Sequence, residues 1–236
     1  MKINNVTMTQ FYQNNMPYYI GQWENNMKNG QGNLYYNNGN IQYGGQWEND
    51  MFHGEGKLYY QNGRICYDGQ WTYNTMRGKC KYYDEDGYIE YEGQCENNMK
   101  SGYGISYNKH GTFVETIVDG KIGYIDARIC YIGQWENDMK NGEGKMYNQN
   151  GKLYYEGQWE NNIKNGQGKY YREDGTLIYD GQWENNMYNG EGKYYRDDGT
   201  IYYEGQFKND VFCGQGRIYY KNGTLSGQWE NNVFQG

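Results

Sequence analysis

A short motif recurs along the chain at a nearly constant interval. It is a Gly-Gln step followed in all but one case by an aromatic residue, and its glycines are Gly21, Gly45, Gly69, Gly93, Gly133, Gly157, Gly181, Gly205 and Gly227. The successive spacings are 24, 24, 24, 40, 24, 24, 24 and 22 residues. A fixed internal period is the signature of repeat architectures, in which each unit contacts only its neighbours. The period therefore predicts an array of small units.

Each unit reads as a β-hairpin. In YEGQWENNIKNGQGKYYREDGTLI, residues 155–178, the first six residues alternate in the way that gives a half-buried strand. A second alternating stretch begins at Gly166, and we expect residues 161–165 between them to form a turn, because Asn tolerates left-handed backbone angles. A second tight reversal is predicted at the glycines that close each unit, Gly39, Gly63, Gly87, Gly151, Gly175, Gly199 and Gly223.

The composition predicts a thin, aromatic core. The chain contains 36 Gly, 31 Tyr and one Pro, and only 36% of its residues are hydrophobic. Because 19% are aromatic, disorder is not expected. No hairpin can bury one of its faces alone, so the hairpins must stack. We expect an all-β fold: a single-layer, elongated solenoid of stacked antiparallel β-hairpins.

The paired glycines suggest how the aromatic rings pack. A large ring needs a flat surface without side chains, so we expect each Trp ring to cover glycines of its own or an adjacent hairpin. The residues that this hypothesis assigns to the repeat framework are Trp23, Trp47, Trp71, Trp135, Trp159, Trp183, Phe207 and Trp229, with Gly21, Gly30, Gly32, Gly157, Gly166 and Gly168.

The pattern Tyr-x-Gly-x-Trp, then Gly-x-Gly, then a loop closed by Gly resembles the MORN repeat, as in YIGQWENNMKNGQGNLYYNNG at 19–39. The resemblance covers about residues 19–236. It divides the chain into a leader (1–17), repeats 1–4 (18–111), a degenerate repeat or insertion (112–130), repeats 5–8 (131–224) and a half-repeat cap (225–236). We expect the leader either to pair with the edge strand or to reach a partner, and the terminal repeats to allow a homodimer.

The chain departs from the family pattern in three ways. Asn or Asp stands three residues after the Trp, where the family usually has Gly, and the period is mostly 24 instead of the usual 23. Cys80 replaces the second Gly of unit three, and Cys95 replaces the Trp of unit four. Within 112–130, VETIV-DG-KIGYI still predicts a hairpin with an Asp119-Gly120 turn, which is either a docking or bending device or tolerated decay.

Charge and motif content disfavour several functions. A net charge of −7 argues against nucleic acid and makes membrane binding an unfavoured alternative. The five cysteines have no metal-ligand spacing and are interpreted as reduced, small apolar residues. His53 and His110 lie in different units, the former in an expected exposed turn, and the recurring glutamates are expected on a solvated face beside Lys28, Lys140 and Lys164. We expect no enzyme activity, cofactor, metal or small-molecule substrate.

Tyrosine doublets supply the candidate interaction surface. Strand alternation places one ring of each doublet inward and the other outward, and outward tyrosines are typical of protein interfaces. The outward set is Tyr36, Tyr60, Tyr83, Tyr171, Tyr195 and Tyr220. The alternative is that these rings shield neighbouring backbone.

The resemblance implies a non-enzymatic scaffold that binds proteins in a cytoskeletal assembly. Because the family includes radial-spoke head proteins and the Asn- and Tyr-rich composition suits an AT-biased protist genome, we expect a cytoplasmic, cytoskeletal location in a ciliary axoneme. Two alternatives are a peripheral phospholipid binder and a carbohydrate- or choline-binding module, the latter because YYREDG is similar to aromatic repeats of bacterial surface proteins.

Overall fold

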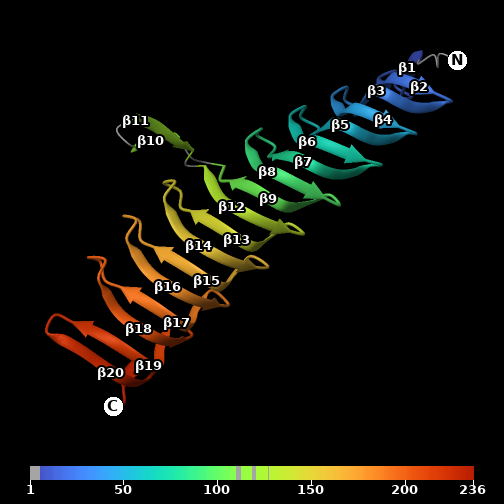
Figure 1. The fold of residues 1–236 in the computed structure, drawn as a ribbon. Coiled ribbons are helices and arrows are strands. Elements are labelled where there is room, and N and C mark those ends of the chain that lie inside the picture. Colours follow the sequence, from blue (N-terminus) through green and yellow to red (C-terminus); the bar gives the residue numbers. More distant parts are fainter. Residues whose placement is uncertain (1–5, 110–112, 119–120, 127) are drawn as a thin grey trace. The chain divides into compact units, whose positions relative to one another are not determined.

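The computed structural model describes residues 6–109, 113–118, 121–126 and 128–236. The chain forms two compact units, one ending at Lys109 and the other beginning at His110. In the described residues every regular element is a β-strand, and each unit contains an open antiparallel sheet (Figure 1). The predicted all-β array of stacked hairpins is therefore confirmed.

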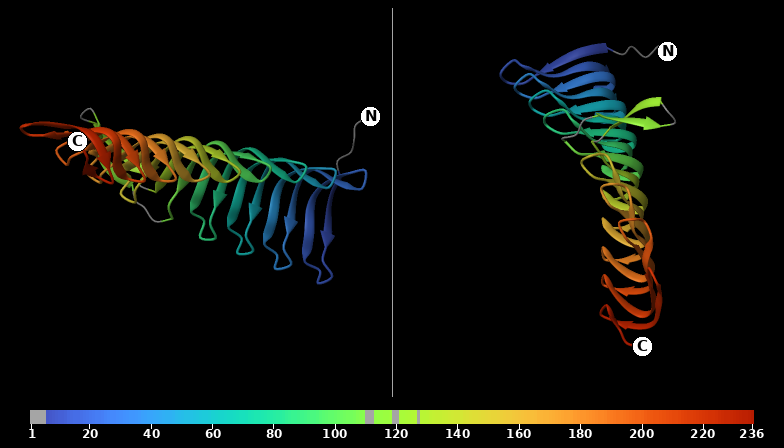
Figure 2. Two further views of the ribbon diagram at one scale, coloured as in Figure 1. Left: turned by 90° about the horizontal axis from the view of Figure 1, so that it is seen from below. Right: turned by 90° about the vertical axis from the view of Figure 1, so that its left-hand side faces the viewer.

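In unit 1 each strand pairs with the next in the chain. The strands are β1 (Val6–Phe11), β2 (Pro17–Glu24), β3 (Met27–Tyr35), β4 (Ile41–Glu48), β5 (Met51–Tyr59), β6 (Ile65–Thr72), β7 (Thr75–Tyr83), β8 (Ile89–Glu96) and β9 (Met99–Tyr107). Figure 2 shows alternate turns between these strands lined up along one edge of the sheet. Of the two roles expected for the leader, pairing with the edge strand is the one that β1 adopts.

Unit 2 repeats this topology. Its main sheet contains β12 (Ile129–Glu136), β13 (Met139–Tyr147), β14 (Leu153–Glu160), β15 (Ile163–Tyr171), β16 (Leu177–Glu184), β17 (Met187–Tyr195), β18 (Ile201–Lys208), β19 (Val211–Tyr220), β20 (Gly223–Glu230) and β21 (Val233–Phe234). A separate hairpin pairs β10 (Phe113–Val118) with β11 (Lys121–Asp126), as predicted for the irregular segment. The expected Asp119-Gly120 turn lies outside the described residues.

The turn inside each hairpin is shorter than predicted. Residues 161–165 were expected to form it, but only Asn161 and Asn162 do, with φ angles of 49° and 69°. Two successive residues with positive φ define the tight turn that matches the twist of antiparallel strands. The return strand therefore begins at Ile163 instead of Gly166.

The Asn or Asp at the second turn position also joins consecutive hairpins. The backbone N–H of Asp50 donates to the carbonyl of Lys28 at 3.0 Å, and the N–H of Lys28 donates to Asp50 Oδ1 at 2.8 Å. We call this pair of bonds the Asx clamp. Its side-chain bond recurs at Asn74, Asn98, Asn162, Asn186, Asp210 and Asn232. A glycine would tolerate the backbone angle but would lack the side-chain acceptor.

The Gln of the recurring motif stabilises a bulge. Gln22 lies opposite a widened part of β3, where its Oε1 accepts the N–H of Gln31 at 2.7 Å. Gly30 has a φ of 90°, and a Cβ added there would lie 2.1 Å from Gln22 Oε1. The first Gly of the Gly-x-Gly pair is therefore required both by backbone conformation and by space.

Tyrosine, not tryptophan, covers the second Gly of the pair, so this part of the ring hypothesis is wrong. A Cβ on Gly32 would lie 2.1 Å from the hydroxyl oxygen of Tyr19. That hydroxyl donates to the carbonyl of Gln22 at 3.2 Å. The Trp of the next hairpin contacts the same Gly through its edge, because the Trp47 indole N–H donates to the Gly32 carbonyl at 3.0 Å.

The core of each unit is a row of alternating Tyr and Trp rings on one face of the sheet, which we call the aromatic face. Tyr19 lies between Trp23 and Trp47, with ring centroids 5.5 and 5.2 Å apart and the planes nearly perpendicular. In unit 2, Tyr155 lies in the same way between Trp159 and Trp183, at 5.0 and 5.3 Å. Edge-to-face contact is a favoured geometry for aromatic rings. One layer of rings replaces an aliphatic core.

Candidate interaction surfaces

The outer position of the aromatic face carries a lysine in some repeats and an aromatic residue in others. Phe52, Tyr188 and Phe212 stack flat on the Tyr of their own hairpin, at centroid distances of 3.8, 3.9 and 3.8 Å. Lys28 and Lys164 hold the same position and place Nζ 5.2 and 4.9 Å from the corresponding Tyr rings. Lys28, Lys140 and Lys164 therefore lie over the aromatic face, not beside the glutamates as the sequence suggested. The reason is the bulge, which pairs Trp23 with Lys28.

Lys164 occupies a cage of four rings. Its Nζ lies 4.8–5.4 Å from the ring centroids of Tyr154, Tyr155, Tyr170 and Trp183. Burial among these rings lowers the pKa of the Lys164 amine to about 8. The ring faces attract a cation, but the lost hydration outweighs that attraction.

The opposite side of the sheet carries ladders of paired charges, and we call it the paired-charge face. In unit 1, Lys57 contacts Asp68 at 2.7 Å and Lys81 contacts Glu92 at 3.0 Å. In unit 2, Lys145 contacts Glu156, Lys169 contacts Asp180 and Lys193 contacts Glu204, at 3.2, 3.9 and 3.1 Å. The hydrogen bond to Asp68 raises the pKa of Lys57.

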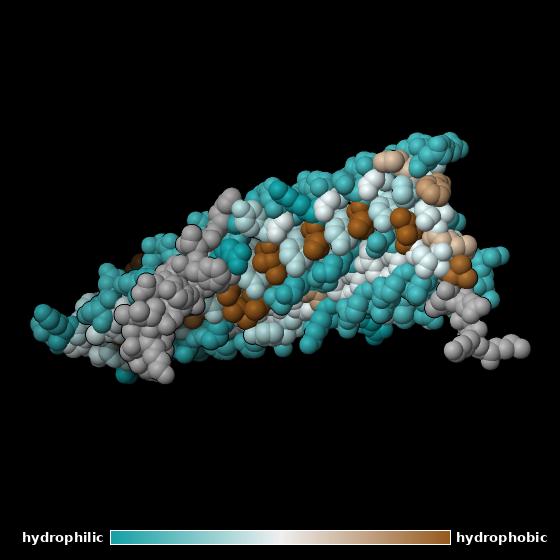
Figure 3. Space-filling model, turned by 90° about the horizontal axis from the view of Figure 1, so that it is seen from above, coloured by the Kyte–Doolittle hydropathy of each residue, from teal (hydrophilic) through white to brown (hydrophobic). Residues whose placement is uncertain are grey.

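Tyrosines extend this face toward the second turn. The Tyr171 hydroxyl donates to Glu156 at 2.6 Å, and this bond lowers the pKa of the carboxyl group. Tyr171 pairs in register with Leu177, as Tyr59 does with Ile65 and Tyr195 with Ile201. Figure 3 shows one face of unit 1, where apolar residues recur at regular intervals between polar ones. Several repeats thus present a half-buried Tyr-aliphatic pair beside a charge pair.

The six candidate tyrosines occupy two different repeat positions. Tyr36 and Tyr60 begin the second turn, and their hydroxyls donate to the carbonyls of Tyr59 and Tyr83 in the next hairpin, at 2.8 and 2.7 Å. Tyr83, Tyr171 and Tyr195 are instead the last residues of return strands. In these repeats Tyr82, Tyr170 and Tyr194 occupy the position that Leu34 and Leu58 hold in the first two repeats, so the Tyr doublet begins one residue earlier. These five are half-buried, whereas Tyr220 is 55% exposed.

Cys80 and Cys95 form a disulfide, which corrects the interpretation of all five cysteines as reduced. The sequence offered one signal of this disulfide, since the two residues replace a Gly and a Trp that contact each other in regular repeats.

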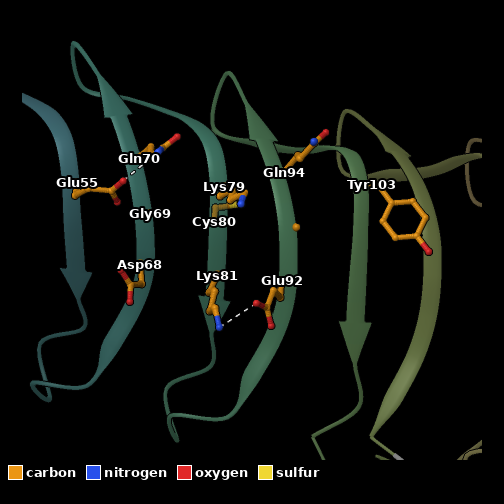
Figure 4. A pocket seen from close by; sticks show the side chains of 11 residues that line it. Glu55, Asp68, Gly69, Gln70, Lys79, Cys80, Lys81, Glu92, Gln94 and Tyr103 are labelled. Atoms are coloured by element: carbon orange, nitrogen blue, oxygen red, sulfur yellow. Dashed lines mark hydrogen bonds and ion pairs between the residues drawn. The ribbon is translucent and has the colours of Figure 1, made fainter.

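An open cavity of about 580 Å³ lies beside Cys80 on the paired-charge face, and Glu55, Asp68, Lys79 and Lys81 contribute to its walls (Figure 4). Cys66, Cys130 and Cys213 are free.

His53 differs from expectation because it lies in β5, not in an exposed turn. Its Nδ1 is 3.2 Å from a carboxylate oxygen of Glu48, and its ring is 5.1 Å from that of Tyr73. Among the described residues no group of three or more His, Cys, Asp or Glu side chains is placed to hold a metal ion. The same part of the chain contains no helix long and apolar enough to span a membrane.

These features define an open array of β-hairpins whose core is a single aromatic layer and whose opposite face carries repeated charge and Tyr-aliphatic pairs. The MORN repeat profile matches residues 19–41, 43–63, 67–87, 91–112, 131–152, 155–177, 179–201 and 203–225. The chain belongs to the MORN-repeat family. No curated protein matches it.

Membership of the family defines the class of function. MORN repeats form protein-interaction or membrane-binding modules, and proteins built from them are generally non-catalytic scaffolds.

Proposed function

We propose that this protein is a non-enzymatic scaffold that binds other proteins in a cytoskeletal assembly of the cytoplasm, namely a ciliary axoneme complex of the radial-spoke kind. The paired-charge face is the contact surface in this proposal. In this proposal it acts by presenting similar groups at successive repeats.

The observation that carries the proposal is the pairing of the lysines on this face. The Lys57, Lys81, Lys145 and Lys193 amines each contact a carboxylate within 3.2 Å. An anionic membrane attracts unpaired cations, so these amines are poorly suited to lipid headgroups. A protein surface with alternating charges and apolar grooves matches them better, because charge complementarity and half-buried tyrosines favour protein interfaces.

The test exchanges charges without removing a pair. In one variant, Lys57→Asp with Asp68→Lys and Lys81→Glu with Glu92→Lys reverse the polarity of two neighbouring pairs but keep the attraction within each. We expect normal folding and a loss of co-sedimentation with isolated axonemes by tenfold or more. Undiminished co-sedimentation of the variant would show that the partner binds elsewhere.

A second experiment tests whether the chain binds axonemes or membranes. The unaltered chain should co-sediment with axonemes and localise to the cilium, and it should not float with vesicles containing phosphatidylserine at moderate salt. Flotation without axoneme binding would replace the scaffold with the phospholipid binder. We also propose a homodimer joined through terminal repeats, for which sedimentation equilibrium of the purified chain should give twice the monomer mass.

A further inference from the structure

Trp23 lacks the hydrogen bond that other tryptophans of the array make. The indole N–H groups of Trp47, Trp71 and Trp183 donate to the carbonyl of the second Gly in the preceding return strand, at 3.0, 3.1 and 3.0 Å. Trp229 makes the same bond at 3.1 Å. Trp23 is only 9% exposed, yet its Nε1 is buried and has no acceptor among the described residues. An unpaired buried donor is unfavourable, so this site is incomplete.

β1 lies where the missing return strand would be. It pairs Val6 with Trp23 and Met8 with Gly21, whereas β3 pairs Gly30 with Trp47 and Gly32 with Gly45. Val6 and Met8 therefore precede Gly30 and Gly32 by one 24-residue period. β1 takes the position of a return strand but has no Gly-x-Gly.

The turn after β1 repeats the same geometry. The Tyr12 hydroxyl donates to the Tyr35 carbonyl at 2.6 Å, as Tyr36 donates to the Tyr59 carbonyl at 2.8 Å. Asn15, with a φ of 62°, stands one period before Gly39, whose φ is 88°. Residues 6–16 thus have the geometry of the second half of a repeat, with Val6, Met8 and Asn15 at the positions of its glycines.

β1 is weakly attached compared with a regular return strand. All six of its residues are exposed, and Val6 and Met8 are 52% and 42% exposed. Segments with few buried contacts open at low free energy. No charged residue occurs from Val6 to Met16, so the strand also lacks the usual protection of a sheet edge against pairing.

We propose that β1 is a replaceable stand-in strand, and that the edge of β2 beneath it binds a Gly-x-Gly return strand supplied by another MORN-repeat chain. The incoming strand would pair with β2 and place the carbonyl of its second Gly at the Trp23 indole N–H. A Tyr at the start of its following turn would replace Tyr12 at the Tyr35 carbonyl. This inference concerns one sheet edge and is independent of the cytoskeletal role proposed above.

The probe is a synthetic peptide with the sequence of residues 27–40, which contains Gly30, Gly32 and Tyr36. Added to the full chain labelled with ¹⁵N, it should shift the Trp23 indole N–H resonance and expose the amides of residues 6–11 to hydrogen exchange. A peptide with Pro in place of Gly32 should not bind, because Pro interrupts a central strand. Binding that leaves β1 protected and the Trp23 resonance unmoved would overturn the proposal.

Two sets of variants complete the test. Trp23→Phe keeps an aromatic ring but removes the N–H donor, so it should weaken peptide binding by about 5-fold, the equivalent of one hydrogen bond. Trp47→Phe is the matched control and should leave the affinity unchanged, because Trp47 already bonds to Gly32. Thr9→Pro with Gln10→Pro releases β1 and should raise the affinity; failure of the peptide to bind this chain would also refute the proposal.

Discussion

Two junctions between hairpins, one in each unit, use the same backbone with different side chains. At the β15–β16 junction, the Trp183 indole N–H donates to the Gly168 carbonyl at 3.0 Å. At the β7–β8 junction, Cys95 and Cys80 hold these two positions and form a disulfide. The register is the same, since Gly168 pairs with Gly181 and Cys80 pairs with Gly93.

The comparison shows that the ring and the glycine are exchanged together. Trp183 bonds to the Gly168 backbone through its indole N–H, whereas Cys95 bonds to the side chain of Cys80, and a Cys opposite a Gly would leave the volume of the Trp ring empty. The two cysteines fill the site with a covalent bond. The Asx clamp is common to both junctions, because Met76 and Lys164 donate to Asn98 and Asn186 at 2.8 and 2.9 Å. Backbone geometry is thus held by the turns, and the junction chemistry is free to vary.

Removal of the Trp183 ring from the regular junction should have the largest effect on the free energy of unfolding. Trp183→Ala leaves a void between Tyr155 and Tyr179 and should lower the free energy of unfolding by about 3–5 kcal/mol. Chemical denaturation followed by circular dichroism measures it. Val233→Ala, at a site 58% exposed, is the control and should change little. Equal midpoints for the two variants would contradict an aromatic core.

Reduction should affect only the disulfide junction. The bond joins residues 15 apart in sequence, and opening it should lower stability by about 3 kcal/mol. Hydrogen exchange in β7 and β8, measured with and without a phosphine reductant, reports the change. The double variant Cys80→Gly with Cys95→Trp rebuilds the regular junction and should not respond to the reductant. A response of the rebuilt chain would mean that a different bond is involved.

An Ala substitution at the second Gly position should destabilise the regular junction more than the disulfide junction. In Gly168→Ala the new Cβ would lie 2.4 Å from the Tyr155 hydroxyl oxygen, so we expect a loss of about 1–3 kcal/mol. Cys80→Ala, compared with the reduced parent chain, should cost under about 1 kcal/mol because a Cβ is already accommodated there. Thermal unfolding of each variant and its parent chain measures the two losses of stability. Similar losses would refute the contact between the Tyr155 ring and Gly168.

The Asx clamp should contribute equally at both junctions. Asn98 and Asn186 have φ angles of 67°, which Gly adopts without strain, so Asn98→Gly and Asn186→Gly remove only the side-chain acceptor. Each should cost about 1 kcal/mol, as expected for one hydrogen bond. Amide exchange of Met76 and Lys164 should accelerate in the respective variants; unchanged rates would show that the backbone bond suffices.

The last expected effect appears only at alkaline pH and concerns Lys164, which holds the position that Met76 holds in the disulfide junction. Its pKa of about 8 in the folded chain lies below the ordinary lysine value of 10.5, so the folded state binds fewer protons between these pH values than the unfolded state does. Stability should therefore rise as pH increases from 8 to 10.5. Lys164→Met should remove that rise. Burial raises the pKa of Tyr155 above its ordinary value of 10.0, so stability falls above about pH 10 in both chains, and the difference between them isolates the lysine.

Much of the fold could be predicted from the sequence because the repeat spacing fixes strands, turns and stacking together. The left-handed Asn and Asp positions and the all-β array are examples. The packing partners could not be predicted. Whether Tyr19 or Trp23 covers Gly32 depends on the bulge at Gln22, which shifts the register of β3 and has no signature in the alternation of residues.

The candidate interaction surfaces could likewise be predicted only in part. The sequence placed tyrosines near the surface but combined Tyr36 with Tyr83, which lie at different repeat positions, because a doublet looks the same whether Leu or Tyr precedes the turn. It also placed Lys164 in solvent, and only the pairing of Trp159 with Lys164 brings the amine over the rings. The sequence by itself determined the period, the hairpins and the aromatic composition, since these are local. The tertiary structure decided which ring meets which glycine, which lysine meets which carboxylate, and that Trp23 has no acceptor within the described part of the chain, because each depends on the neighbouring hairpin.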